Sequence, residues 1–306
     1  MSSQSVNINT CPYCLDCGGC DYIETPYSET LKIKINDVLE LLKSNDAKPR
    51  NINNIGITGS PKVFNYRNRC QLHVINGVAG FFKKKTHDLI KIQKCLMLDD
   101  LINEKISKLK FPSTYNSKVE LYLSNGTVAE RLVEKKYDNS FGQVNDEVNK
   151  IMTQKVIELL DPNKDDTLLE LYCGGGNFTF AISEYTATNI KITGIDIKTP
   201  AQTRKNIEFI EADAEKGLKQ LFSMGKLNSY NKVLLDPPRA GAGRNVCNII
   251  ASIQPKIIVY VSCNPETLAA DANVLCSKGY TWSHMQLLDM FPFTKYVESL
   301  NMFIRA

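Results

Sequence analysis

The chain has no run of about 18 apolar residues, the length that a membrane-spanning helix needs. Its first residues, Met1 to Thr10, are mostly polar and do not form the apolar segment of a secretory signal. Internal repeats and low-complexity segments are also lacking. An apolar share of 43% with 23% charged residues is ordinary globular composition. The sequence therefore excludes fibrous and disordered proteins, and we expect a cytoplasmic monomer that has no membrane partner.

With 306 residues the chain exceeds the roughly 100 to 200 residues typical of one domain, so two domains or one large elaborated domain are expected. Residues 1–140 hold 20 Lys and Arg against 15 Asp and Glu, whereas residues 141–306 hold 17 against 18. Between Lys62 and Lys94, eight basic residues stand against one acid, Asp88. Such a strip suits the phosphates of a nucleic acid, although a solvated surface explains a charge run equally well.

Ten cysteines without a secretory signal do not indicate a disulfide framework. Four of them, Cys11, Cys14, Cys17 and Cys20, are each separated by two residues, and the other six are scattered. Four thiolates can bind one zinc ion tetrahedrally, and closely spaced cysteines also bind iron-sulfur clusters. The short intervals leave little chain to wrap one small ion, which favours the cluster, and zinc remains the alternative.

Periodicity predicts two different folds along the chain. Residues 1–140 read as a small α+β module with helices over Thr30–Lys43 and Leu98–Leu109 and strands over Cys70–Ile75, Gly80–Phe82 and Val119–Leu123. Over residues 141–306, helices alternate with apolar runs that end at Cys173, Asp196, Asp213, Asp236 and Cys263. This alternation predicts an α/β, doubly wound, Rossmann-like domain. A helix within residues 21–45 is a candidate to pack on that second domain.

A glycine turn, Gly174 to Gly176, separates an apolar strand from a helix that starts near Asn177. Such a turn lets a ligand approach the backbone at the carboxyl edge of the sheet. The next strand ends at Asp196, which can accept hydrogen bonds from ribose hydroxyls, and Asp213 could meet an adenine amine. Thr179 stands where a dinucleotide fingerprint has its third glycine. The pattern therefore favours S-adenosylmethionine, the commonest adenosine-type ligand without a pyrophosphate on this architecture.

Two later strand ends carry groups suited to chemistry. Asp236 is followed by two prolines and Arg239, where methyltransferases acting on amines usually have an aromatic residue. Cys263 directly precedes an expected helix start at Asn264 and Pro265, so the helix dipole is expected to stabilise its thiolate as a nucleophile. Glu298 follows an apolar segment, which is expected to raise its pKa and suit it to act as a base.

Together these pieces resemble the RNA uracil-5 methyltransferase family, in the branch that carries an iron-sulfur cluster. The resemblance runs from Cys11 to Glu298. The motifs that carry it, in the family's order, are Cys11-x5-Cys17-Gly-Gly-Cys20, Tyr66-Arg67-Asn68, Cys95, Phe141-Gly-Gln143-Val-Asn145, Leu171-Tyr-Cys-Gly-Gly-Gly-Asn-Phe-Thr179, Asp236-Pro-Pro-Arg239, Ser262-Cys-Asn-Pro265 and Phe291-Pro to Glu298.

The resemblance implies a role for each matching residue. Cys263 matches the nucleophile that adds to uracil C6, Glu298 the general base, and Asp236 an acid between the cofactor and the uracil edge. The matching cofactor contacts are Gln143, Tyr172, Gly174, Asn177, Asp196, Asp213 and Asp236. The ligands of a [4Fe-4S] cluster fall on Cys11, Cys17, Cys20 and Cys95, which leaves Cys14 spare.

The sequence departs from the family's pattern in three places. Histidine is usual where Phe293 and Tyr296 stand, and glutamate where Asp196 stands. The chain starts close to the cysteine cluster, so we expect RNA to be held by the basic module and the catalytic face and not by the small β-barrel of some relatives. The expected activity is methylation of uridine C5 in RNA, with ribosomal RNA favoured over transfer RNA. The alternatives are a cytosine-5 RNA methyltransferase and a catalytically idle RNA-binding iron-sulfur protein.

Overall fold

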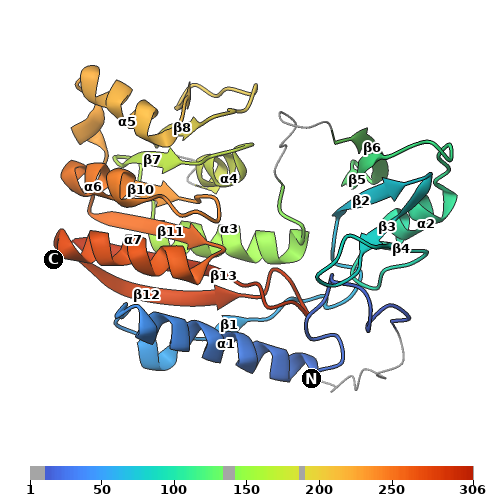
Figure 1. Cartoon of the computed structure of the whole chain (residues 1–306). Helices are drawn as coiled ribbons and strands as arrows, with labels where there is room; N and C mark the ends of the chain where they lie inside the picture. The colour runs from blue at the N-terminus through green and yellow to red at the C-terminus, as the bar shows by residue number, and fades with distance from the viewer. Residues whose placement is uncertain (1–10, 134–141, 186–189, 306) are drawn as a thin grey trace.

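The computed structural model describes residues 11–133, 142–185 and 190–305, which form one large and one small β-sheet with their covering helices (Figure 1). The boundary expected between residues 140 and 141, and Phe141 of the expected motif, lie outside the described residues. No helix in the described ranges is long and apolar enough to cross a membrane.

The large sheet has the strand order β1-β12-β13-β11-β10-β7-β8-β9. Its strands are β1 (Ile57–Thr58), β7 (Thr167–Leu171), β8 (Lys191–Asp196), β9 (Ile207–Glu211), β10 (Lys232–Leu235), β11 (Ile257–Ser262), β12 (Tyr280–Leu288) and β13 (Glu298–Arg305). Every neighbouring pair is parallel except those of β13, which runs antiparallel to β11 and β12. The expected Rossmann-like sheet is confirmed, and β1, β12 and β13 extend it beyond the strands expected from the sequence.

Helices cover both faces of this sheet, as a doubly wound fold requires. One face packs against α3 (Asp146–Leu160) and α4 (Asn177–Tyr185) through a core that includes Met152, Phe178 and Val259. The other face packs against α1 (Tyr27–Ser44), α5 (Ala214–Ser223), α6 (Arg244–Ile253) and α7 (Pro265–Ser277). The strands alternate between these two cores, which explains their continuous apolar sequences.

The chain's first helix belongs to the layers of the large sheet. Buried Val38 and Leu42 of α1 lie in the same hydrophobic cluster as Trp282 and Leu287 of β12. β1 pairs in parallel with the end of β12, with Ile57 opposite Leu287. Residues from the start and the end of the chain therefore build one edge of the same sheet.

The small sheet is antiparallel, with the strand order β4-β3-β2-β5-β6. Its strands are β2 (Arg69–Ile75), β3 (Val78–Phe82), β4 (Leu89–Lys91), β5 (Ser117–Ser124) and β6 (Thr127–Leu132). Helix α2 (Asp100–Lys108) covers one face by burying Ile102 and Ile106 against Leu72 and Leu121. In Figure 1 the arrowheads of β11 and β12 point toward the small sheet, so the carboxyl edge of the large sheet faces it.

Candidate functional site

Cys263 and Glu298 come together at the carboxyl edge of the large sheet. The antiparallel register of β11 and β13 pairs Ser262 with Ser299, and one further step places Cys263 opposite Glu298. Helix α7 starts directly after Cys263, because Asn264 caps it by accepting a hydrogen bond from the Glu266 N–H at 3.2 Å. The Pro265 at its first position fits the same start. A thiol and a carboxyl group therefore share one end of neighbouring strands.

The pKa of the Cys263 thiol is raised to about 11 by burial and by the nearby carboxylates of Glu298 and Asp236. This corrects the expectation that the start of α7 leaves the thiol readily ionised. The helix dipole stabilises a nearby negative charge by about 0.3 to 1 kcal/mol at exposed sites. Here this effect is smaller than the opposing effects of burial and of two carboxylates on the thiolate. Glu298 itself is buried, and its pKa is raised well above the ordinary value by burial and by Asp236. That direction agrees with the expectation for this residue.

Arg239 is the cation that opposes these shifts. Its charge lowers the pKa of both Cys263 and Glu298. The Arg239 carbonyl accepts hydrogen bonds from the side chains of Asn264 at 2.9 Å and Thr267 at 3.2 Å, which ties it to the start of α7. Its guanidinium lies 4.7 Å from the centre of the Tyr296 ring. The sequence motif contained Arg239, but only the fold reveals its place beside the thiol.

The glycine turn between β7 and α4 has left-handed backbone conformations and free space beside its first two glycines. Tyr172 and Gly174 have positive φ values of 64° and 51°. A Cβ added at Gly174 or Gly175 would meet nothing within 4 Å, whereas one at Gly176 would lie 2.4 Å from the Phe180 ring. The Gly174 N–H donates a hydrogen bond to Asp196 Oδ2 at 2.9 Å. The turn therefore leaves space for a ligand above its first two glycines.

Three carboxyl groups gather below this turn. Glu170 of β7 is fully buried, accepts a hydrogen bond from Thr179 Oγ1 at 2.5 Å, and has a pKa raised to about 8. Burial and the charge of Asp196 raise the pKa of Asp236 to about 7. Asp196 and Asp236 also raise the pKa of Glu170. Like charges held this close favour a bound cation. Glu170 was not singled out in the sequence, where it appears only as an acid inside an apolar strand.

Other expected cofactor residues lie around the same edge. Asp213 lies beyond the end of β9 and caps α5, where its side chain accepts a hydrogen bond from the Glu215 N–H at 3.1 Å; its charge raises the pKa of Tyr172. Gln143 precedes α3, and its carbonyl accepts a hydrogen bond from the Asn68 side chain at 2.9 Å. The expected contact of Gln143 with a cofactor stays a prediction.

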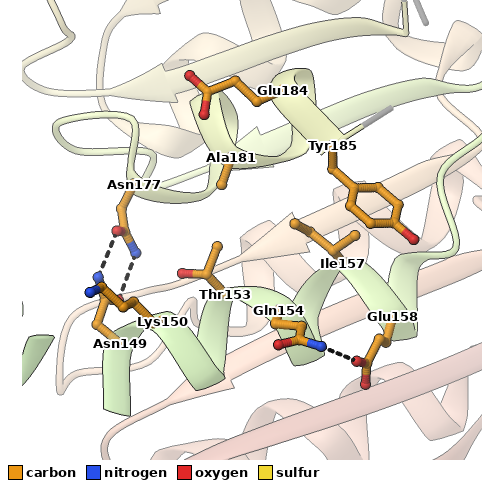
Figure 2. Close-up of a pocket in the computed structure, with 10 residues that line it drawn as sticks. All are labelled: Asn149, Lys150, Thr153, Gln154, Ile157, Glu158, Asn177, Ala181, Glu184 and Tyr185. Carbon is orange, nitrogen blue, oxygen red and sulfur yellow. Dashed lines mark hydrogen bonds between the residues drawn. The ribbon is translucent and has the colours of Figure 1, made fainter. Parts of the chain in front are cut away.

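Asn177 connects α4 to α3. Its side-chain amide exchanges two hydrogen bonds with Asn149, at 2.9 and 3.0 Å, as Figure 2 shows. The pair closes one end of an open pocket of about 640 Å³ between these helices. The pocket contains neither Cys263 nor Glu298, so it is separate from the thiol. Its lining residues are Asn149, Lys150, Thr153, Gln154, Ile157, Glu158, Asn177, Ala181, Glu184 and Tyr185.

The cysteine segment lies between the two sheets. Cys17 forms an isolated bridge with Lys83, at the end of the β3 hairpin. On the other side, the N–H groups of Asp21 and Tyr22 both donate to the Phe293 carbonyl at 2.9 Å, in the loop before β13. The segment therefore contacts both the small sheet and the loop before β13.

Cys11, Cys17, Cys20 and Cys95 are close enough to influence one another electrostatically. Burial and the charges of Cys95, Cys17 and Cys11 raise the pKa of Cys20 to about 12. Cys20 and Cys95 also pack against one small hydrophobic cluster around Tyr66 and Phe293. Within the described residues, no three His, Cys, Asp or Glu side chains converge as metal ligands would. The thiols approach one another without forming a finished ligand set.

Comparisons with known proteins agree with this geometry. The family model described as tRNA (Uracil-5-)-methyltransferase matches residues 108–306. An uncharacterized RNA methyltransferase of Bdellovibrio bacteriovorus is 30% identical, and the match covers 95% of this chain and 77% of that protein. A 23S rRNA (uracil(1939)-C(5))-methyltransferase of Haemophilus parainfluenzae is 29% identical over 99% of this chain and 84% of its own.

A solved structure has the same fold. The tRNA (uracil-54, C5)-methyltransferase of Pyrococcus abyssi, in complex with S-adenosyl-L-homocysteine, superposes with a TM-score of 0.69. The match covers 94% of this chain and 86% of that one, at 21% sequence identity. At this identity the likeness shows the fold alone.

Proposed function

Because the chain belongs to the tRNA (uracil-5-)-methyltransferase family, and so methylates uracil C5 in RNA with S-adenosylmethionine, we propose that its target is a uridine of 23S-type ribosomal RNA. The choice of ribosomal RNA is supported by relatives that carry that activity in their names and align with almost the whole chain. We further propose that the reaction proceeds through a covalent adduct with Cys263. The observation that carries the mechanism is the pairing of Ser262 with Ser299 across β11 and β13, which brings the neighbouring Cys263 and Glu298 close enough for the charge of Glu298 to raise the pKa of the thiol.

In the proposed mechanism, Cys263 activates the base. Uracil C5 is a weak nucleophile, and addition of the Cys263 thiolate to C6 gives it enolate character. S-adenosylmethionine, when bound, would supply the methyl group to C5 by breaking its sulfonium–methyl bond, and it would leave as S-adenosylhomocysteine. Glu298 then accepts the C5 proton, and the electrons of that C–H bond restore the C5–C6 double bond and expel the thiolate. Asp236 hydrogen-bonds the uracil edge. The Cys263 thiol and the methyl group of the cofactor can both reach the uracil only if the base is flipped out of its stack in the RNA.

The acidic edge of the sheet suits the proposed cofactor. Burial and the charges of Asp236 and Asp196 raise the pKa of Glu170, and burial and the charge of Asp196 raise the pKa of Asp236. S-adenosylmethionine carries a sulfonium and an ammonium group, and a cation placed there would stabilise the ionised carboxylates. The open space above Gly174 and Gly175 admits its adenosine part. Tyr172, Asn177, Asp213 and Gln143 complete the proposed contacts.

The face of the small sheet opposite α2 carries groups that suit RNA, and its Arg69 and Arg131 side chains also pair with Glu120. Cys70 and Leu72 point into the core with α2, so Arg69 and His73 of β2 lie on the opposite face. There the Tyr122 ring has the Arg69 and Arg131 guanidinium groups 5.9 and 5.6 Å from its centre. The His73 ring stacks on Phe82 with 3.7 Å between centroids. Aromatic rings and cations on one face can stack bases and contact phosphates of unpaired RNA.

The proposed substrate is tested by mapping 5-methyluridine in RNA from cells with and without this protein. We expect one position in the large ribosomal RNA to lose the modification. Purified protein should also methylate a fragment that contains this uridine and not the same fragment with cytidine in its place. Loss of the modification from transfer RNA alone would contradict the choice of ribosomal RNA. Methylation of the cytidine fragment would favour a cytosine-5 enzyme, and no methylation of any RNA would favour an idle binding protein.

We also propose that Cys11, Cys17, Cys20 and Cys95 hold a [4Fe-4S] cluster. Their donor set fits it, since the four thiols already influence one another and a cluster would compensate the mutual repulsion of their thiolates. The Cys95 loop is prepared for this position, because Asn103 accepts from the Cys95 N–H and donates to its carbonyl. A bound cluster would link the cysteine segment covalently to the small module.

Cys95→Ser is expected to remove the iron, the brown colour and part of the RNA affinity of anaerobically purified protein. Cys14→Ser is the matched control and should keep all three, because Cys14 is the cysteine that the proposed ligand set leaves spare. Iron and sulfide analysis and visible absorption spectra measure the loss of the cluster. RNA affinity should fall as well, because metal binding and folding are coupled. Iron retained without Cys95 but lost without Cys14 would instead assign the site to the four closely spaced cysteines. Zinc without sulfide would replace the cluster by a zinc site.

The raised pKa of Cys263 predicts how its reactivity depends on pH. A thiol protonated below about 11 should be alkylated slowly at neutral pH and faster as the pH rises toward that value. Asp236→Asn removes a negative charge, so the alkylation curve of Cys263 in this variant should lie at lower pH than in the wild type. Arg239→Gln removes a positive charge and should move the curve to higher pH. Iodoacetamide labelling of the Cys263 peptide, followed by mass spectrometry, measures the curves. A midpoint near neutral pH in the unliganded protein would contradict the prediction.

A further inference from the structure

A lysine is completely buried in α1, on the side that faces the loop before β13. Thr30, Lys34, Val38 and Leu42 form the buried stripe of the helix, and the Lys34 side chain has no exposed surface. Its ammonium donates three hydrogen bonds, to Asp289 Oδ1 at 2.5 Å, the Phe291 carbonyl at 3.0 Å and the Tyr296 carbonyl at 2.7 Å. An ammonium has three donors, so all of them are used.

The acceptors of Lys34 tie down both sides of one loop. Asp289 stands at its beginning, where its N–H donates to the Thr58 carbonyl at 2.9 Å and its Oδ2 accepts from the Tyr27 hydroxyl at 2.7 Å. The carbonyls of Phe291 and Tyr296 lie on its two arms. We call residues 289–297 the catalytic loop, because Glu298 follows it directly.

The catalytic loop continues into the proposed active site at two points. The Tyr296 ring lies over the Arg239 guanidinium at 4.7 Å, and Arg239 influences the ionisation of Cys263. At its end, Glu298 begins β13 opposite Leu288 of β12. Three charged groups act on Cys263. Arg239 contacts the catalytic loop by stacking on Tyr296, and Glu298 follows the loop directly in the chain. Asp236 comes from the end of β10.

We propose that Lys34 is a positioning residue that holds the catalytic loop, and with it the Arg239 side chain and Glu298, in the reactive arrangement beside Cys263 before RNA binds. The inference builds on the proposed function and assigns a role to a residue outside the expected site. A buried ion pair is a poor way to gain stability, because desolvation of both charges offsets their attraction. Three donors aimed at two arms of one loop are well suited to fixing its conformation.

The test removes both charges together. Lys34→Met with Asp289→Leu leaves no unpaired buried charge, so the double variant is expected to fold, as apolar replacements of buried ion pairs often do. We expect its kcat for RNA methylation to fall by about 10- to 100-fold, a cost typical of displaced catalytic groups. Affinity for S-adenosylhomocysteine, whose proposed contacts lie elsewhere on the sheet edge, should be unchanged. The alkylation curve of Cys263 should move to higher pH, because the Arg239 guanidinium, no longer held by the loop, would lower the pKa of the thiol less.

Two single variants separate positioning from general loosening. Tyr27→Phe removes a hydrogen bond to Asp289 and the acceptor of the Ser60 N–H but leaves all three bonds of Lys34, so kcat and the alkylation curve should stay at wild-type values. Tyr296→Leu changes a partly exposed ring and keeps the ion pair, so it should fold and shift the alkylation curve as the double variant does. If the double variant does not fold, Tyr296→Leu therefore still tests whether the catalytic loop acts on Cys263 through Arg239.

Three results would overturn the proposal: wild-type kcat and an unshifted curve in the double variant, an unshifted curve in Tyr296→Leu, or equal losses in Tyr27→Phe. The alkylation curve needs no RNA. A failure of the wild-type protein to methylate uracil would therefore count against the proposed function, while the curve would still decide the role of Lys34.

Discussion

Cys263→Ala is expected to abolish RNA methylation while the affinity for S-adenosylmethionine stays close to that of the wild type. Without the thiol, C5 cannot be activated by addition at C6, and removal of a nucleophile usually costs several orders of magnitude in kcat. Most of the proposed cofactor contacts lie at the ends of β7, β8 and β9, with Asp236 at the end of β10 and Gln143 before α3, whereas Cys263 follows β11. The substitution therefore separates the chemical step from cofactor binding.

Methyl transfer from labelled cofactor to RNA and calorimetric cofactor binding measure the two effects. Cys276→Ala provides the control, because Cys276 is an exposed thiol on α7, the helix that follows Cys263. It should retain both activities. Measurable turnover by Cys263→Ala would show that another group activates the base.

Glu298→Gln is expected to trap the enzyme on its RNA. The amide has the shape of the carboxyl group but cannot accept the C5 proton, so addition and methyl transfer proceed while elimination of Cys263 stops. Burial favours the change, because a neutral amide is desolvated at a lower cost than a carboxylate in the buried site of Glu298. We expect an RNA-linked protein band on a denaturing gel that accumulates with cofactor present.

Glu266→Gln is the control for this experiment, since Glu266 is an exposed acid in the first turn of the helix after Cys263. It should turn over normally and give no stable band. Normal release of methylated RNA by Glu298→Gln would mean that a different group, with Asp236 the nearest candidate, removes the proton. A band from Glu298→Gln that disappears in the double variant with Cys263→Ala would locate the bond at that thiol.

The strands of the large sheet were visible in the sequence mainly where both faces are buried. Continuous apolar runs predicted β7, β8, β10 and β11, because helices cover them on two sides, and the edge strand β9 was recognised although two of its residues are exposed. β12 has a mixed composition, with Ser283, His284 and Gln286 among its residues, and it depends on pairing with β13. β1 consists of two residues held by a partner from the far end of the chain. No local pattern encodes such a pairing.

The sequence singled out residues of the candidate site, but it did not reveal their environment. A cysteine before a capped helix pointed to Cys263, and the helix does begin there. The direction of its pKa shift was wrong because the local helix was visible in the sequence while the facing carboxyl groups were not. Lys34 was equally hidden, since a lysine inside a helix usually lies on its solvated side. Its partner Asp289 is 255 positions away.

The contact between the two ends of the chain has a consequence for synthesis on the ribosome. α1 and β1 emerge first, yet they pack on β12, and Lys34 remains without its partner until Asp289 has been made. The small sheet between them pairs strands that are near in sequence and can form early, because loop closure between close segments costs less entropy. We expect the apolar stripe of α1 to stay uncovered through most of translation. Nascent chains stalled before residue 280 should therefore be cleaved by proteases within α1 while the small sheet is already protected.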